Sequence, residues 1–138
     1  MKLPEGFEDL FDDAVKAFLV LTTMRAPEQP SVAPVWFVAD DRGLLFMSDV
    51  DSVKDRNIRR QARVAAVLMA EGEHARYVSV HGTAERIDAG ELDAASLYRR
   101  IVRRYEGRDH RDPQPSATMY FRIVPDAMFG YDYRDYEA

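Results

Sequence analysis

The order of apolar and polar residues predicts a chain dominated by β-strands. Apolar residues first recur at helical spacing over 6–17, where Phe7, Leu10, Phe11 and Ala14 form one stripe that continues to Phe18. The stretches that follow are alternating or short and apolar, which is typical of strands. They cover residues 18–25, 30–39, 44–48, 64–70, 77–87 and 117–124, with a candidate seventh strand over 129–133.

Turn-forming residues place the breaks between these strands. The segment Asp40–Gly43 is typical of a turn, so the first three strands are expected to form a meander. Pro34 cannot donate a backbone hydrogen bond, which predicts an edge or a bulge at that point. Gly82 lies inside a predicted strand and indicates a bend of the kind that a barrel needs.

Two further helices are predicted, over 52–61 and about 91–106, the second with Gly107 as its C-terminal cap. The apolar face of the second helix carries Tyr98, Ile101, Val102 and Tyr105, and its other face carries Arg99, Arg100, Arg103 and Arg104. We expect these arginines to face solvent or to contact another subunit. A polar loop is expected over 107–116.

Six or seven strands with three helices favour a mainly β fold, a small antiparallel barrel with flanking helices, over a parallel α/β sheet. The 138 residues suffice for one domain and are too few for two separate cores, so a single domain over 1–138 is expected. Apolar residues at 46% and charged residues at 31% support a packed core.

Composition excludes several functional classes. The chain has no cysteine, which excludes disulfide scaffolds, thiolate metal sites and cysteine catalysis. The longest apolar run, 64–70, is far shorter than the roughly 18 residues of a membrane-spanning helix, and the first six residues do not resemble a secretory signal. A cytoplasmic protein without a membrane partner is therefore expected. The net charge of −5 disfavours nonspecific binding to nucleic acid.

The candidate chemistry lies at the start of the helix predicted over 52–61. Ser52, three residues before Asp55, forms a capping-box pattern that places Lys54 in the first turn. The interaction of an exposed lysine there with the helix dipole is unfavourable by about 0.3–1 kcal/mol, and a bound anion would make the lysine favourable. Helix N–H groups, Ser52 and the ammonium group together predict a phosphate site. Four arginines add to the positive field: Arg56, Arg59, Arg60 and Arg63.

Several of these residues also have a plain structural interpretation. Lys54 can instead pair with Asp51 or Asp55 on a solvated helix. Trp36, in an apolar strand, is by default a core residue. His74, His81 and His110 lack metal-ligand spacing, so no metal site is expected. His81 should face solvent or a groove, and in a groove it can donate a proton to a reduced substrate, as can Tyr77, Tyr120 or Tyr131.

Four segments together resemble the pyridoxamine-phosphate-oxidase-like split β-barrel family: Pro34–Val38, Leu44–Ser48, Ser52–Val64 and Val80–Glu85. The likeness extends from about Phe18 to Tyr131, and the nearest branch is the deazaflavin-dependent (F-420) oxidoreductases. The resemblance implies a six- to seven-stranded antiparallel split barrel, a homodimer, and a flavin or deazaflavin in a groove at the subunit interface.

The resemblance also implies roles for single residues. Lys54 matches the lysine that contacts the cofactor phosphate, the strand with Trp36 matches the one beside the ring, and Tyr131 matches a strand that reaches the partner subunit's site. The full implied cofactor-binding set is Val35, Trp36, Phe37, Met47, Ser48, Ser52, Lys54, Asn57, Arg60 and Tyr131. Three departures from the family pattern bear on the phosphate geometry and the choice of cofactor: Val53, Gln61–Ala62 and Pro27–Gln29.

The leading interpretation is an oxidoreductase that binds F-420 and passes hydride to an unsaturated small molecule such as an enone, quinone or tetrapyrrole. The cofactor does this chemistry, so no catalytic dyad is expected. The alternatives are an FMN-binding oxidoreductase and a non-catalytic barrel that holds a flavin or haem-like molecule. An OB-like barrel that binds single-stranded nucleic acid is opposed by the acidic net charge.

Overall fold

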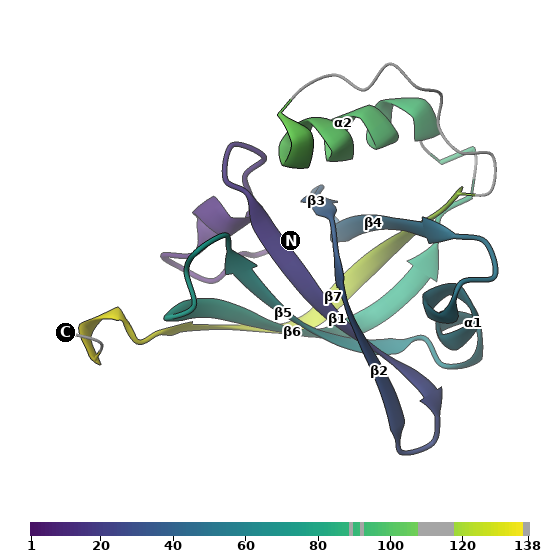
Figure 1. The fold of residues 1–138 in the computed structure, drawn as a ribbon, viewed down its shortest axis with the longest axis horizontal. Helices are drawn as coiled ribbons and strands as arrows, with labels where there is room; N and C mark the ends of the chain where they lie inside the picture. The colour runs from purple at the N-terminus through teal and green to yellow at the C-terminus, as the bar shows by residue number, and fades with distance from the viewer. Residues whose placement is uncertain (89, 92, 108–117, 137–138) are drawn as a thin grey trace.

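The computed structural model describes residues 1–88, 90–91, 93–107 and 118–136, and its seven strands form one antiparallel sheet that curls into a half-barrel (Figure 1). The strands are β1 (Ala17–Ala26), β2 (Gln29–Val35), β3 (Phe37–Ala39), β4 (Leu44–Asp49), β5 (Arg63–Ala70), β6 (Arg76–Arg86) and β7 (Thr118–Asp132). The helical elements are α1 (Val53–Arg60), α2 (Ala94–Glu106) and two 3-10 turns, η1 (Glu8–Phe11) and η2 (Arg134–Tyr136). The expected mainly β architecture is confirmed.

The order of strands in the sheet is β2-β1-β5-β6-β7-β4-β3. Both pairings of the predicted meander occur, but the strand predicted over 30–39 is divided at Trp36, so the three strands do not form one continuous meander. β2 pairs with β1, whereas β3 pairs with β4 and β4 then pairs with β7. Pro34 lies on the edge strand β2, as expected of a residue without an N–H donor. The chain leaves the β1 ladder after Val35 and enters the β4 ladder at Phe37, so Trp36 belongs to neither strand.

β7 is one strand of 15 residues, whereas the pattern predicted two. The β6–β7 ladder pairs Gly82 with Pro125 but His81 with Ala127, so one extra residue of β7 forms a bulge and the strand continues. Gly82 lies at this irregularity and allows a close approach of the two strands, because a Cβ atom there would lie 2.4 Å from a carbonyl oxygen of β7. The loop predicted over 107–116 and Ala117 lie outside the described residues, apart from Gly107, which caps α2 at φ 70°.

The helix predicted over 6–17 is wrong, because only η1 forms there and Ala17 already belongs to β1. Leu10 and Phe11 are buried, so the apolar stripe covers the core through a single turn. The side chain of Asp12 accepts a hydrogen bond from the Ala14 N–H at 2.8 Å, a local bond that competes with continuation of the helix. The number of α-helices among the described residues is therefore two.

The core fills the inside of the half-barrel, and α2 lies over β3 (Figure 1). Phe46 and Phe121 face each other across β4 and β7 with ring centroids 5.1 Å apart, and both are fully buried. A second apolar cluster joins Ile101 and Tyr105 of α2 to Val38 and Leu45. Among the described residues, neither helix has the length and apolar character needed to cross a membrane.

Arg104 attaches α2 to the rest of the fold. The pattern placed it on a solvated face, but the residue is buried, and its guanidinium donates hydrogen bonds to the carbonyl groups of Phe37, Leu10 and Val15 at 2.8–3.1 Å. Burial lowers the pKa of Arg104 from its usual value. The guanidinium thus joins α2 to carbonyl groups of three segments that are distant from it in sequence.

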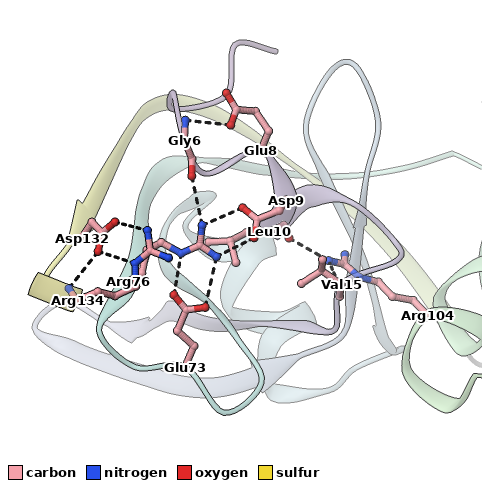
Figure 2. A network of polar contacts seen from close by, with 10 residues as sticks. All are labelled: Gly6, Glu8, Asp9, Leu10, Val15, Glu73, Arg76, Arg104, Asp132 and Arg134. Carbon is pink, nitrogen blue, oxygen red and sulfur yellow. Dashed lines mark hydrogen bonds and ion pairs between the residues drawn. The ribbon is translucent and has the colours of Figure 1, made fainter. Parts of the chain in front are cut away.

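A second arginine, Arg76, joins the N-terminal segment to β6 (Figure 2). Its guanidinium donates two hydrogen bonds to Asp9, at 2.7 and 3.0 Å, and one of 2.7 Å to Glu73. It also reaches the Gly6 carbonyl at 3.2 Å. Hydrogen bonds to Asp9 and Glu73 raise the pKa of Arg76, and the same contact lowers the pKa of Asp9.

Candidate functional site

A cavity of about 410 Å³ opens where the chain passes from β2 to β3. Its walls come from the end of β2, the end of β4, the first turn of α1, one residue of α2 and the start of β7. The lining residues are Pro34, Val35, Trp36, Met47, Ser48, Asp49, Lys54, Tyr98 and Thr118. The volume lies within the range of small-molecule sites in proteins, roughly 300–1,000 Å³.

One wall of this cavity is aromatic. Trp36 is 38% exposed, so the default interpretation of Trp36 as a core residue is wrong. Its indole stacks on the ring of Tyr105, with centroids 4.9 Å apart and planes 5° from parallel. The Tyr105 hydroxyl accepts a hydrogen bond from the Phe37 N–H at 3.0 Å, and burial raises the pKa of Tyr105. Trp36 is therefore held rigidly while it remains accessible to a planar ligand.

The N-terminus of α1 contributes Lys54 to the cavity, and the Ser52 half of the predicted capping box forms there, whereas Asp55 accepts from Asp51 and not from Ser52. The Asp55 N–H donates to Ser52 Oγ at 3.1 Å, and Asp55 Oδ2 accepts from the Asp51 N–H at 2.8 Å. Ser48 and Ser52 share a hydrogen bond of 2.7 Å between their hydroxyl groups. This arrangement fixes the end of β4 against the helix start, which places Ser48 and Lys54 on the same cavity.

Lys54 is half-buried and has no carboxylate within ion-pair distance in the described part of the chain. The alternative that it pairs with Asp51 or Asp55 is wrong, because Arg59 takes both acids. The Arg59 guanidinium lies 2.6 Å from Asp51 and 3.6 Å from Asp55. An ammonium group therefore lines the cavity beside a helix N-terminus, and Asp49 brings a carboxylate to the same wall.

The structure brings five of the ten predicted site residues to the cavity: Val35, Trp36, Met47, Ser48 and Lys54. Phe37 is fully buried, and Ser52 acts through Ser48 and the helix cap. Asn57 is also buried and donates to Thr23 Oγ1 at 3.0 Å, whereas Arg60 donates to the Met24 carbonyl. Tyr131 stacks on Tyr77 with centroids 5.1 Å apart and does not line this cavity.

Sequence reasoning missed four lining residues: Pro34, Asp49, Tyr98 and Thr118. The β4–β7 ladder pairs Asp49 with Thr118, so the strand register brings these two together. A correct pairing of β4 with β7 would have indicated Thr118. Tyr98 comes from α2. The apolar stripe of that helix predicts that Tyr98 packs against the rest of the protein, but not which part of the protein it contacts.

None of the described groups considered as proton donors lines the cavity, although Tyr120 is paired with the lining residue Met47 across β4 and β7. His81 is exposed on β6, and Tyr77 belongs to the Tyr131 stack. Tyr120 is buried, and burial raises its pKa to about 12. His110 lies outside the described residues. Among the residues that the structure describes, no cluster of three metal-ligating side chains occurs.

A curled antiparallel half-barrel with a cavity lined by an aromatic side chain and a lysine is typical of the split-barrel class of folds. The chain belongs to the pyridoxamine 5'-phosphate oxidase family, whose sequence model matches residues 11–131. Members of this family bind flavins such as FMN. No curated protein sequence matches the chain.

Solved structures support the same fold. An F420 reductase is similar over 92% of this chain and 98% of its own, with a TM-score of 0.75 and 24% identity. A conserved hypothetical protein from Mycobacterium tuberculosis covers 100% and 90% of the two chains, with a TM-score of 0.75 and 22% identity. The haem storage protein of Vibrio cholerae covers 95% and 96%, with a TM-score of 0.70 and 18% identity. At these identities the likeness establishes the fold alone.

Proposed function

We propose that this protein is an oxidoreductase that binds the deazaflavin F-420 in the Trp36–Lys54 cavity and passes hydride to an unsaturated small molecule. The observation that carries the proposal is the half-buried Lys54 ammonium, which has no carboxylate partner among the described residues and lines the cavity beside the start of α1. Similarity to an F420 reductase supports the choice of cofactor.

The donor set of the cavity fits such a cofactor. Lys54 and the first turn of α1 would bind its phosphate, because an ammonium and helix N–H groups are complementary to that anion. Trp36 would pack against its planar ring system, and the backbone at Trp36 lies outside both ladders, where it can hydrogen-bond a heterocycle. The cofactor supplies the hydride chemistry, and the protein supplies binding, orientation and exclusion of water.

Two other functions have support of their own. The match to the pyridoxamine 5'-phosphate oxidase family favours FMN as the second candidate cofactor. Similarity to a haem storage protein supports a non-catalytic barrel that holds its ligand without turnover. All three functions use the same cavity, so they differ in which ligand binds and in whether a bound ligand reacts.

The proposal includes a homodimer. Phe129, Tyr131 and Tyr133 are 53%, 37% and 45% exposed on or just after the outer half of β7, where β4 no longer covers that strand. Tyr131 does not line the cavity of its own subunit, so its predicted role requires a second copy. Sedimentation of the purified protein with and without cofactor measures whether the mass is that of two chains.

The first test is equilibrium binding of F-420 and of FMN to the purified protein. Trp36 is the sole tryptophan and lines the cavity, so quenching of its fluorescence is a local signal. Tighter binding of F-420, followed by reduction of an enone or quinone, is the expected result. Tighter binding of FMN moves the protein to the second candidate, and binding of either cofactor without turnover supports a carrier.

Lys54→Met tests the assignment of the phosphate site. We expect cofactor affinity to fall by about 1.5–3 kcal/mol, roughly 10- to 150-fold, because one charge-assisted contact is lost. The matched control is Lys16→Met, which removes another half-buried lysine that does not line the cavity. An affinity that is equal in the two variants would remove Lys54 from the site.

A further inference from the structure

A second cavity, of about 530 Å³, lies beside α1 and shares no lining residue with the Trp36–Lys54 cavity. Three of its six lining residues are arginines and none is acidic. The lining residues are Arg25, Ser31, Val53, Arg56, Asn57 and Arg60. In a chain with a net charge of −5, this is a local concentration of positive charge without counter-ions.

The local structure brings these arginines together. The β1–β2 ladder shifts register between Met24 and Ala26, so Arg25 lies at an irregularity of the kind that redirects a side chain. Arg60 donates a hydrogen bond to the Met24 carbonyl, next to that irregularity. The buried Asn57–Thr23 hydrogen bond of 3.0 Å joins α1 to β1 one turn earlier. These contacts hold the Arg56–Arg60 face of the helix beside Arg25.

The arginines of this cavity differ from other exposed arginines of the chain that form ion pairs with carboxylates. Exposed arginines such as Arg63, Arg100 and Arg134 each pair with an aspartate. Arg25 and Arg56 have no hydrogen-bond or ion-pair partner for their side chains in the described part of the chain. Arg56 and Arg60 are also four residues apart on one helix, a like-charge spacing that destabilises the helix. An external anion would remove that repulsion and supply the missing partner.

We propose that Arg25, Arg56 and Arg60, with Ser31, form a second binding site that takes a small anion with several closely spaced charges, an oligophosphate or an oligocarboxylate. Planar guanidinium groups match both oxyanions through paired N–H donors, and three of them favour a multiply charged ligand over a singly charged one. The site does not depend on the proposed cofactor, because the two cavities are lined by different residues.

Calorimetric titration of the cofactor-free protein tests this site. The probes are inorganic tripolyphosphate and a triglutamate peptide, with inorganic phosphate and acetate as the weakly charged comparisons. We expect one of the first two to bind at least about tenfold more tightly than the comparisons, and the stronger of the two identifies the ligand chemistry. Equal binding of all four probes would overturn the proposal.

Charge-matched variants locate the binding. Arg25→Gln and Arg56→Gln should each weaken binding about tenfold, because each removes a charge-assisted contact. Arg99→Gln is the control, since Arg99 is also exposed, carries the same charge and lines a different cavity. An equal loss in Arg99→Gln would indicate a diffuse field and contradict the site. If a single-stranded oligonucleotide bound more tightly than tripolyphosphate and triglutamate, and the binding depended on Arg25, the surface would bind nucleic acid and the proposed small-anion site would be wrong.

A protein NMR titration with tripolyphosphate gives an independent readout if a variant folds poorly. Backbone amides of Ser31 and Asn57 should shift, whereas those of Ser48 and Trp36 should not. Shifts confined to the Trp36–Lys54 cavity would contradict a second site. Because no deazaflavin or flavin is present, failure here leaves the proposed function untouched, and failure of cofactor binding leaves this site untouched.

Discussion

Arg76 and Lys54 are two cations that the fold treats in opposite ways. The side chain of Arg76 is 9% exposed, and two carboxylates and a carbonyl group surround its guanidinium. Lys54 is half-buried in a cavity wall, and the described residues give it no such partner. Arg76 is matched inside the chain and stabilises it, whereas Lys54 is available to a ligand. An unmatched charge in an acidic protein is therefore informative about binding.

Arg76→Met should have the largest effect on this comparison. It leaves Asp9 and Glu73 without their shared partner, so we expect the free energy of unfolding to fall by about 2–4 kcal/mol in urea denaturation. The control is Arg134→Met, because Arg134 forms an exposed pair with Asp132 and should change stability little. If both variants lost the same free energy of unfolding, the burial of Arg76 and its two carboxylates would add nothing to stability.

The pH dependence of stability should report the same cluster with a smaller effect. Hydrogen bonds from Arg76 lower the pKa of Asp9 from its usual 3.8, so the folded state binds the proton less readily than the unfolded state. Asp9 therefore stabilises the fold above about pH 4, and that contribution is lost as the pH falls through the lowered pKa. Because Asp9 is 45% exposed, we expect a loss below about 1 kcal/mol.

Denaturation of wild type and Asp9→Asn between pH 5 and pH 2 measures this contribution. The variant should lose less stability on acidification than the wild type, since its side chain has no proton to gain. Parallel curves for the two proteins would show that Asp9 does not contribute to acid sensitivity.

Lys54→Met should have the smallest effect on stability and the opposite sign. Removing a cation from the first turn of α1 relieves its repulsion with the helix dipole, so the free energy of unfolding should rise by about 0.3–0.5 kcal/mol. Arg59→Met, on the same helix, is the control and should lower stability because it releases Asp51 and Asp55. A clear destabilisation by Lys54→Met would mean that Lys54 has a stabilising partner within the chain, as Arg76 does, and would contradict the comparison.

Local features of the fold were predictable from sequence, whereas the pairing of distant strands was not. The cap at Ser52, the edge position of Pro34 and the close approach at Gly82 each follow from the chemistry of one residue and its neighbours. The predicted meander missed the break at Trp36 and the pairing of β4 with β7, because alternation along a strand does not specify its partner. The helix predicted over 6–17 failed because burial of Leu10 and Phe11 needs only one turn.

The same distinction between local and long-range features applies to the residues of the candidate site. Lys54, which lines the cavity, was predicted from a local signal, because its charge conflicts with its position on a helix. Tyr98 and Thr118 were missed because they reach the cavity from α2 and β7, far along the chain. Phe37 alternates with Trp36 and so points the other way, into the core, although both belong to the same short segment.

The position of β7 also determines when the cavity can form during synthesis. β7 is the last strand in sequence, yet it lies between β6 and β4 in the sheet. Until its residues leave the ribosome, β4 has no strand partner except β3, and Met47 and Ser48 lack their partners on β7. The cavity is therefore completed last, through contacts distant in sequence that form slowly. A nascent chain halted before β7 would expose two unpaired strand edges and bind no ligand in this cavity.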